Sequence, residues 1–531
     1  MRLALAAASL AALCATPALA ALKTGEKAPD FTADGYQAGK PLHFSLAEAR
    51  KKGPVVLYFF PAAETKGCNI EAKMFADASD QFKAAGATLI GGGPVVAVAV
   101  PWWSLLAVLL AFVGFFAGGI YVGAALSSLA LLAGFGLSDR PFWNFIGEML
   151  WGPSTNFVLV SVPLFLLMGE VMLRAGLSER LYRALNVWMG RLPGGLLHTN
   201  IISCGVFSAV AGSSVATAAT MGSVALPYFE KSHYPPRLVL GSLAAGGALG
   251  NLIPPGITFI IYGLITETSV GALYLAAVGP SLLVVVLFLG VILWYSHVLN
   301  LKADDGLTLK WRDRLLSLVD LLPTTLLIGL VLGTIYAGWA TPTESAALGV
   351  AGSLVLAAAD RRLNWRMLAE SMHATARTTS MIALILFGAY FLNYILSSLG
   401  VPQMLAKFLT GLPLPGWAIM LVIIGFYLAL GTFMEGMSMV ITTIPLLFPV
   451  VKALGYDPIW FGVVITMLVE IAMISPPDGT VLYVLQGMRR QPGPITDVFM
   501  GVLPFMAVYM LAIGILMLCP AIALWLPAAV M

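Results

Sequence analysis

The sequence has very little charge for its length. Only 10% of its 531 residues are Asp, Glu, Lys or Arg, and 59% are hydrophobic, whereas about 25% of an average soluble chain is charged. So little polar surface excludes the series of soluble domains that this length would otherwise suggest. With a mean hydropathy of +0.91, the sequence predicts an all-α polytopic membrane protein.

Cysteine and histidine are also scarce. The four cysteines, Cys14, Cys68, Cys204 and Cys519, lie far apart, and the five histidines show no metal-ligand spacing, which argues against a disulfide framework or a zinc site. The net charge of +3 is too small to indicate nucleic acid as a partner. The sequence contains no GxxxxGK[S/T] stretch, so ATP is not expected to drive this chain. We expect no cofactor and no enzymatic activity.

The first 20 residues combine one Arg, a short apolar run and Ala-Leu-Ala before Ala21. This pattern predicts a signal peptide over residues 1–20, because an apolar run of about 16 residues is short for a spanning helix. An uncleaved membrane anchor is the alternative. In both cases the segment that follows is expected to be exported.

Residues 21–92 form the soluble-looking part of the sequence. PVVLYFFP (54–61) and ATLIG (87–91) predict strands, and residues 69–86 predict an amphipathic helix. Between the first strand and the helix lie Pro61, Thr65 and Cys68, which place a thiol at a helix N-terminus, where the helix dipole lowers a thiol pKa.

This PxxxTxxC spacing resembles the peroxidatic loop of peroxiredoxins, which have a thioredoxin-like α/β fold. The resemblance implies that Cys68 would reduce peroxide in a pocket shaped by Pro61 and Thr65. It covers only about half of a peroxiredoxin, so we expect a truncated segment without peroxidase activity.

Residues 93–531 are predicted to form the membrane domain, and their basic residues indicate its orientation. Sixteen Lys and Arg residues lie in one set of connections, at 174–194, 230–237, 299–316, 360–377 and 488–493. The other connections contain three, Arg140, Lys407 and Lys452. Because basic residues accumulate on the cytoplasmic side, the first set is predicted to be cytoplasmic and the N-terminal segment periplasmic.

The membrane domain contains an internal repeat at an offset of 222 residues. Prolines coincide at this offset: Pro227 and Pro449, Pro236 and Pro458, Pro254-Pro255 and Pro476-Pro477. The charge asymmetry places corresponding segments on opposite sides, so the two copies, at about 141–298 and 360–527, are predicted to be inverted. Inverted repeats of secondary transporters bind substrate at their interface, near mid-membrane.

Each copy contains two interruptions of its apolar segments. Proline pairs interrupt residues 251–256 and 474–479, and small residues interrupt residues 211–217 and 431–436. In the first copy, apolar arms of about 15 residues flank residues 211–217. Such arms predict a re-entrant hairpin, because each is short for a full span. Freed carbonyls and hydroxyls at such breaks are hard oxygen ligands suited to a cation. Close helix packing through small residues is the alternative.

Several separated stretches carry a family resemblance. GVFSAVAGSSVATAATMGSVALP (205–227), GNLIPPGITFIIYG (250–263), WATPTESAALGV (339–350) and GTFMEGMSM (431–439) followed by ISPPDG (474–479) resemble the large membrane subunit of tripartite ATP-independent periplasmic (TRAP) transporters. The similarity extends over essentially all of residues 104–531.

This resemblance implies sodium-driven uptake of an organic anion, usually a carboxylate, across a bacterial inner membrane by an elevator movement of re-entrant hairpins and broken helices. Sodium is the only metal it implies. It also implies two partners, a small membrane subunit and a soluble periplasmic substrate-binding protein, in addition to membrane lipid and the small organic anion.

The resemblance also assigns site residues by motif. One sodium site would comprise Ser213, Ser214, Gly250, Asn251 and Pro254. A second sodium site would comprise Gly431, Met434, Glu435, Ser475 and Pro476. The substrate would lie near Thr217, Gly256, Gly436 and Asp478. The chain departs from the usual family pattern at Thr217, Gly256, Glu435, Gly436 and Asp478.

Acidic residues in or beside apolar segments are energetically costly. We expect Glu435 and Asp478 to be functional, because both lie at repeat-related breaks. Glu344 follows Thr-Pro and is expected to cap a helix. For Glu170 and Glu470 we expect hydrogen bonds that pack helices, with a proton site as the alternative.

Residues 174–191 place arginines on one helix face and apolar side chains on the other. This pattern predicts an interfacial helix that braces the moving hairpin, with simple anchoring as the alternative. Two other functions remain as alternatives, a stand-alone carrier coupled to sodium or protons and a membrane-tethered thiol peroxidase that acts through Cys68.

Overall fold

The computed structural model describes residues 30, 32–37, 40–59, 75, 82, 84–86, 88–92, 102–137, 142–230, 232, 234–301, 311–489 and 492–530. The chain divides into two compact units, Met1–Val98 and Ala99–Met531. The predicted signal peptide (1–20) lies outside the described residues, and so do Pro61, Thr65 and Cys68.

Strands dominate the described residues of the first unit. An antiparallel pair joins β1 (Thr32–Gln37) to β2 (Lys40–Ser45), and α2 (Leu46–Lys52) follows directly. A parallel pair joins β3 (Val55–Phe59) to β4 (Thr88–Gly92), with Val55 opposite Thr88. These two strands confirm the two predicted from the sequence, and their parallel pairing requires a crossover connection. Most of the helix predicted over 69–86 lies outside the described residues.

The described residues of the second unit are helical. In chain order the elements are α5 (Trp102–Ala117), α6 (Val122–Leu137), η1 (Phe142–Phe145), α7 (Ile146–Ser154), η2 (Phe157–Val160), α8 (Ser161–Arg174), α9 (Leu177–Met189), α10 (Gly195–Ala211), α11 (Ser214–Glu230), α12 (Pro236–Gly247), α13 (Ile257–Thr266), α14 (Val270–Val298), α15 (Trp311–Tyr336), α16 (Pro342–Ala359), α17 (Trp365–Ser398), α18 (Val401–Thr410), α19 (Gly416–Leu430), α20 (Gly436–Ala453), α21 (Pro458–Ile474), α22 (Thr480–Met488), α23 (Thr496–Leu518) and α24 (Ala521–Val530).

Several of these helices match the dimensions of a lipid bilayer. Among the described residues, seven are long and apolar enough to cross a membrane: η2 with α8, and α14, α15, α16, α17, α20 and α23. The arms α10, α11 and α19 are shorter, with 17, 17 and 15 residues. The prediction of short hairpin arms is confirmed for these three helices, whereas α20, the second arm of the second hairpin, has 18 residues and is one of the seven helices long enough to span.

The repeat found in the sequence recurs in the helix boundaries. Helix α11 begins at Ser214 and α20 at Gly436, and helix α12 begins at Pro236 and α21 at Pro458; both intervals equal the sequence offset. A proline pair separates α12 from α13 and another separates α21 from α22, and both Pro-Pro bonds are cis. The order α10–α14 is thus repeated as α19–α23.

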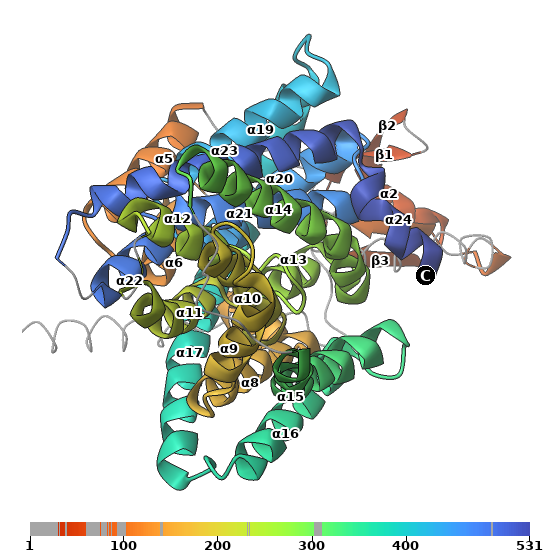
Figure 1. Ribbon diagram of the computed structural model, residues 1–531. Helices are drawn as coiled ribbons and strands as arrows, with labels where there is room; N and C mark the ends of the chain where they lie inside the picture. The colour runs from red at the N-terminus through yellow and green to blue at the C-terminus, as the bar shows by residue number, and fades with distance from the viewer. Residues whose placement is uncertain are drawn as a thin grey trace, which may run out of the picture. The chain divides into compact units, whose positions relative to one another are not determined.

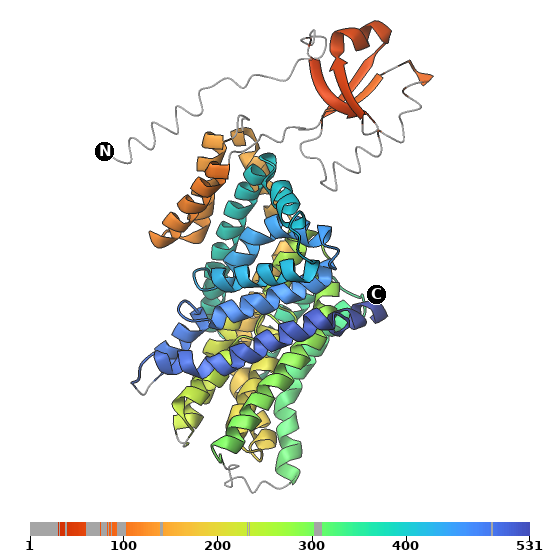
Figure 2. The same cartoon turned by 90° about the horizontal axis from the view of Figure 1, so that it is seen from above.

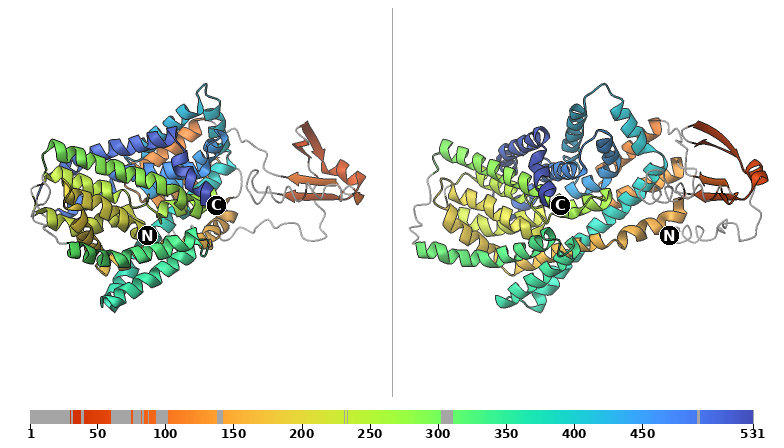
Figure 3. Two further views of the ribbon diagram at one scale, coloured as in Figure 1. Left: turned by 45° about the vertical axis from the view of Figure 1, so that its right-hand side comes forward. Right: turned by 90° about the vertical axis from the view of Figure 1, so that its right-hand side faces the viewer.

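The two copies interleave in space. Helix α12 of the first copy packs on α23 of the second, α11 packs on α22, and α13 packs on α20. In Figure 1 and in both views of Figure 3, helices α8–α11 (yellow) lie between the α15–α16 pair (green) and helices α19–α23 (blue). Figure 2 shows α20, α21 and α23 running side by side, as their contacts require.

Two features explain this close packing. A Cβ atom built on Gly241 of α12 would lie 2.0 Å from the Gly501 carbonyl oxygen of α23, so the two backbones approach more closely than any side chain would allow. Helix α21 is buried at every position from Trp460 to Ile474, as expected for a helix that is apolar on all sides. Helix α21 therefore forms the centre of the membrane unit.

Ion pairs connect the segments that the charge count places on one side of the membrane. Arg180 pairs with Asp360, which joins residues 174–194 to residues 360–377. Arg237 and Arg489 both pair with Asp497, which joins residues 230–237 to residues 488–493. Segments that the sequence groups together by charge therefore meet in space.

Candidate functional site

The tip of the first hairpin contacts the first proline break directly. Helix α10 ends at Ala211, and Gly212 turns the chain with a φ of 59°, in the left-handed region that glycine adopts most easily. The Gly212 carbonyl oxygen accepts a hydrogen bond of 3.3 Å from the Ile257 N–H, beyond the break. A Cβ atom on Gly250 would lie 2.3 Å from the Ser214 Cα, so only glycine allows this approach.

A polar cluster lies where the tip and the break meet. The Asn251 Nδ2 donates a hydrogen bond of 3.0 Å to the Ser214 Oγ. The Ser214 Oγ donates to both carboxylate oxygens of Glu470, at 2.9 and 2.7 Å, and the Asn251 main-chain N–H donates to Glu470 Oε1 at 3.0 Å. All three residues are buried. The cluster therefore joins α11 and the first break to α21 of the other copy.

The structure brings together most of the residues predicted for the first sodium site. Ser214, Gly250 and Asn251 are in contact, and Ser213 precedes the contact, with its carbonyl carbon 2.6 Å from the position of a Cβ on Gly250. Pro254 is buried within the break. The sequence interpretation left Glu470 out of this site. Its hydrogen bonds do pack helices together, as expected, but they do so through the site residues themselves.

The second tip also packs against the end of its own broken helix. A Cβ atom on Gly431 would lie 2.6 Å from the Ala472 Cβ, and one on Gly436 would lie 2.6 Å from the Val469 Cγ1 and 3.4 Å from the Met473 Sδ. At the repeat offset, Gly436 and Met473 correspond to Ser214 and Asn251. The Ser214 hydroxyl of the first copy is therefore replaced by a glycine in the second, and the Asn251 amide is replaced by the thioether of Met473.

The remaining residues predicted for the second sodium site surround this tip. Met434 is buried, and Ser475 and Pro476 are half-buried. The Glu435 Oε2 accepts hydrogen bonds from the Ser438 N–H and hydroxyl, so Glu435 is the N-cap of α20. This cap uses one carboxylate oxygen and stabilises the first turn of α20.

The residues predicted to contact substrate differ in exposure. The Thr217 hydroxyl is buried without a hydrogen-bond partner, whereas Asp478 is exposed in the second break. Gly256 and Gly436 are buried, and a contact of 3.4 Å between Thr258 Oγ1 and Met437 Sδ connects the segments that follow them. The structure thus brings Gly256 close to the second tip.

Two further acidic residues have structural partners. The Glu344 Oε2 accepts hydrogen bonds from the N–H and the hydroxyl of Thr341, and the Glu344 N–H donates to the Thr341 hydroxyl, a capping box that confirms the predicted cap. Glu170 pairs with Arg174 one turn along α8 at 3.4 Å, and Arg174 pairs with Glu370 of α17 at 2.7 Å. Glu170 therefore acts on helix packing through Arg174 rather than directly.

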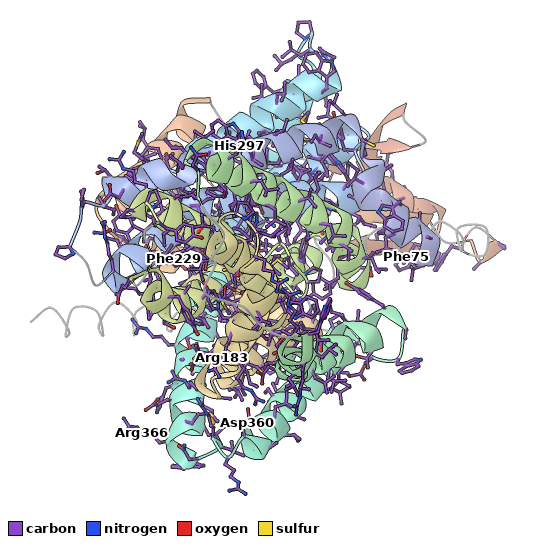
Figure 4. The ribbon with its side chains drawn as sticks, in the orientation of Figure 1. Phe75, Arg183, Phe229, His297, Asp360 and Arg366 are labelled. Carbon is purple, nitrogen blue, oxygen red and sulfur yellow. The ribbon has the colours of Figure 1, made fainter. Side chains whose placement is uncertain are left out.

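The amphipathic segment forms α9, which packs on α10 and α11 of the first hairpin and on α15. Arg180 of α9 pairs with Asp360 at 2.7 Å and with Asp320 of α15 at 3.3 Å. The hydrogen bonds that Arg180 donates to these two carboxylates, first of all to Asp360, raise the pKa of Arg180. Figure 4 labels Asp360 beside the turn between α16 and α17, with Arg183 of α9 at the same edge. The expected brace between the hairpin and its neighbours is therefore present as a set of contacts.

The oxygen donors at the two tips define the kind of cation that would fit. Among the described residues, no group of three or more His, Cys, Asp or Glu side chains could hold a metal, so the candidate ligands are hydroxyl, amide and main-chain oxygens with single carboxylates. Such donors suit a hard cation rather than a transition metal.

Two interleaved repeats with hairpin tips packed on proline-broken helices define a secondary membrane transporter. The family model for the tripartite ATP-independent periplasmic transporter, DctM component, matches residues 99–522, and the chain belongs to this family. It is a multi-pass membrane protein, and the relatives it matches are permeases rather than enzymes.

Two relatives illustrate the similarity. The chain is 34% identical over 383 residues to the C4-dicarboxylate TRAP transporter large permease protein DctM of Pseudomonas aeruginosa, covering 71% of this chain and 88% of the relative. It is 30% identical over 420 residues to the sialic acid TRAP transporter large permease protein SiaM of Vibrio cholerae, covering 78% of this chain and 96% of the relative.

The fold is also similar to that of a solved transporter. The crystal structure of the Alcanivorax borkumensis YdaH transporter aligns with a TM-score of 0.53 and 17% identity over 80% of this chain and 98% of that chain. This likeness concerns the fold alone.

Residues 24–92 match the AhpC/TSA family, in agreement with the peroxiredoxin resemblance of this segment.

Proposed function

We propose that the chain is the large permease of a sodium-coupled TRAP transporter that takes up an organic anion across the bacterial inner membrane. It would act with a small membrane subunit and with a periplasmic binding protein that delivers the substrate. In this proposal the hairpins and broken helices move as one body against α15–α17.

The observation that carries the proposal is the contact between the first tip and the first proline break. The Ser214 hydroxyl oxygen and the Asn251 Nδ2 lie 3.0 Å apart, and the Oδ1 of the same amide is a further oxygen ligand. The proline pair also leaves main-chain carbonyls without helical partners. These hard oxygens would hold sodium, and the second tip would offer mainly main-chain oxygens together with Glu435 and Ser475. Sodium bound there would hold the tip against the break and so favour the substrate-binding conformation.

The substrate is proposed to be a carboxylate, near Thr217, Gly256, Gly436 and Asp478. The two relatives described above are named for C4-dicarboxylates and for sialic acid, which share a carboxylate group. The Thr217 hydroxyl is buried and has no hydrogen-bond partner among the described residues, and a bound carboxylate would accept a hydrogen bond from it. This donor supports placing the anion beside the first tip.

Uptake by proteoliposomes tests this proposal. The vesicles would contain the chain and its small subunit, with a candidate binding protein and a labelled carboxylate outside, and an inward sodium gradient would be compared with an equal potassium gradient. We expect uptake to need sodium and the binding protein, and to fall at least about tenfold in Ser214→Ala and Asn251→Ala.

Ser223→Ala is the matched control, because the Ser223 hydroxyl lies on the same helix but bonds only to the Thr220 carbonyl. Uptake that is indifferent to sodium would replace the proposal with a proton-coupled or uncoupled carrier. Uptake that persists without any binding protein would replace it with a stand-alone carrier.

A further inference from the structure

We propose that Glu470 supplies the negative charge of the first sodium site, so that this site is assembled from both repeats. The inference rests on the proposed function, because it assigns a further ligand to the same site. It goes beyond the motif-based assignment, which draws the site only from the first copy.

Glu470 lies in a fully enclosed position of the membrane unit. Its exposed fraction is 0%, and it occupies α21, whose other residues from Trp460 to Ile474 are buried as well. Two residues of the first sodium site contact its carboxylate, Ser214 through its hydroxyl and Asn251 through its main-chain N–H. The carboxyl group therefore lies within the ligand set rather than beside it.

Among the described residues, Glu470 forms no ion pair. Within the described part of the chain, the ion pairs of the membrane unit involve Arg174, Arg180, Arg183, Arg237, Arg366 and Arg489, and none includes Glu470. An ionised carboxylate without a partner is strongly unfavourable in a buried site. A monovalent cation held between Glu470, Ser214 and Asn251 would provide the missing charge.

The carboxylate also has acceptor capacity to spare. Among the described residues it accepts hydrogen bonds from the Ser214 hydroxyl, shared between both oxygens, and from the Asn251 N–H on Oε1, whereas a carboxylate offers about four lone-pair sites. The three hydrogen bonds fix the orientation of the group. Oxygen ligands of this kind are the ones that hard cations prefer.

The second tip has no equivalent of this carboxylate. At the repeat offset, Ala248 corresponds to Glu470, just as Ser214 and Asn251 correspond to Gly436 and Met473. The two sodium sites are therefore unequal: the carboxylate of the first is fully buried, whereas Glu435 of the second is half-buried and caps α20. In this proposal the first site dominates the affinity of the protein for sodium.

A purely structural role for Glu470 makes a different prediction. If the carboxylate only held the tip in place, glutamine would substitute for it, because the glutamine oxygen can still accept hydrogen bonds from Ser214 and Asn251. If the charge binds the cation, Glu470→Gln must weaken sodium binding although the hydrogen bonds are retained, and Glu470→Asp must weaken it less.

The test is direct sodium binding to the purified complex of the full chain with its small subunit. Radioactive sodium binding and the sodium-dependent rise in melting temperature would be measured, with potassium as the reference salt. We expect Glu470→Gln to fold as well as the wild type without sodium and to bind sodium about 10- to 100-fold more weakly. Glu170→Gln is the matched control, since it removes a half-buried carboxylate of α8 outside the site, and its sodium affinity should equal that of the wild type.

Sodium affinity within about twofold of the wild type in Glu470→Gln would overturn the inference and leave the proposed function intact. A wild-type complex that binds no sodium would overturn both. If Glu470→Gln does not fold, a double-mutant cycle between Glu470→Asp and Ser214→Ala replaces it: effects on sodium affinity that are coupled support the inference, and additive effects overturn it.

Discussion

The Ser214 hydroxyl donates a hydrogen bond of 2.7 Å to the Glu470 carboxylate across 256 residues of sequence. The bond joins the first hairpin tip to the central helix of the other copy. Because α12 also packs on α23 at Gly241 and Gly501, the two copies form one closely packed body around α21. The elevator movement proposed above would therefore carry both hairpins together.

The buried Thr217 hydroxyl predicts that its removal weakens substrate binding without lowering the stability of the protein. Thr217→Val replaces a buried hydroxyl that has no hydrogen-bond partner among the described residues with a methyl group of similar size, so the melting temperature should stay equal or rise. If the hydroxyl binds the substrate, the KM for uptake should rise about 5- to 20-fold.

Thr220→Val is the control for this substitution, because its hydroxyl is also buried and unpaired but lies outside the predicted substrate contacts. Uptake kinetics and thermal unfolding of both variants provide the comparison. An unchanged KM in Thr217→Val would remove Thr217 from the substrate site.

The contact between Gly241 and Gly501 predicts a large packing defect. In Gly241→Ala the new Cβ would lie 2.0 Å from the Gly501 carbonyl oxygen, so α12 and α23 must separate, at a cost of about 1–3 kcal/mol or more. Thermal unfolding in detergent, followed by tryptophan fluorescence, should show a lower melting temperature. Gly425→Ala in α19 should not lower it, because beyond the adjacent residues and the backbone of its own helix no described atom lies within 4 Å of the new Cβ. Equal melting temperatures in the two variants would contradict the packing described.

The ion pairs of Arg180 predict a modest, salt-dependent contribution to stability. Arg180→Gln removes both the Asp320 and the Asp360 partner, and because these groups are about one-third exposed we expect a loss of about 1 kcal/mol or less. The loss should shrink as salt is raised. Arg183→Gln removes an exposed pair with Glu179 inside α9 and should have no effect; a matching loss in that variant would show that the α9 brace does not depend on Arg180.

We expect transport not to depend on the thiol of Cys68 in the N-terminal segment. Cys68→Ser should leave uptake unchanged, since no step of the proposed transport uses a thiol, and neither protein should consume hydrogen peroxide with a thiol reductant. Peroxide consumption that disappears in Cys68→Ser would instead restore the thiol-peroxidase alternative for this segment.

Much of the membrane architecture could be predicted from the sequence, because the repeat is encoded in prolines and glycines that act locally. The breaks at Pro254-Pro255 and Pro476-Pro477 and the tip at Gly212 lie where the offset and the backbone preferences of these residues place them. Strands β3 and β4 followed equally from their apolar runs.

The part played by Glu470 could not be found in this way. The repeat pairs Glu470 with Ala248, so comparison of the copies gives it no polar counterpart, and its partner Ser214 is 256 residues away. The available signal was an acidic residue inside an otherwise apolar helix, six positions before a proline pair. Long-range packing, which determines what such a residue contacts, leaves no local trace in the sequence.

The bond between Ser214 and Glu470 also has a consequence for biogenesis. The ribosome makes Ser214 256 residues before Glu470, which corresponds to about 10–50 s at ordinary rates of synthesis. During that interval the first hairpin has already left the ribosome, while the carboxylate that pairs with its tip does not yet exist. The nascent first repeat must therefore wait, with its tip hydrated or covered by the insertion machinery, until the second repeat arrives to complete it.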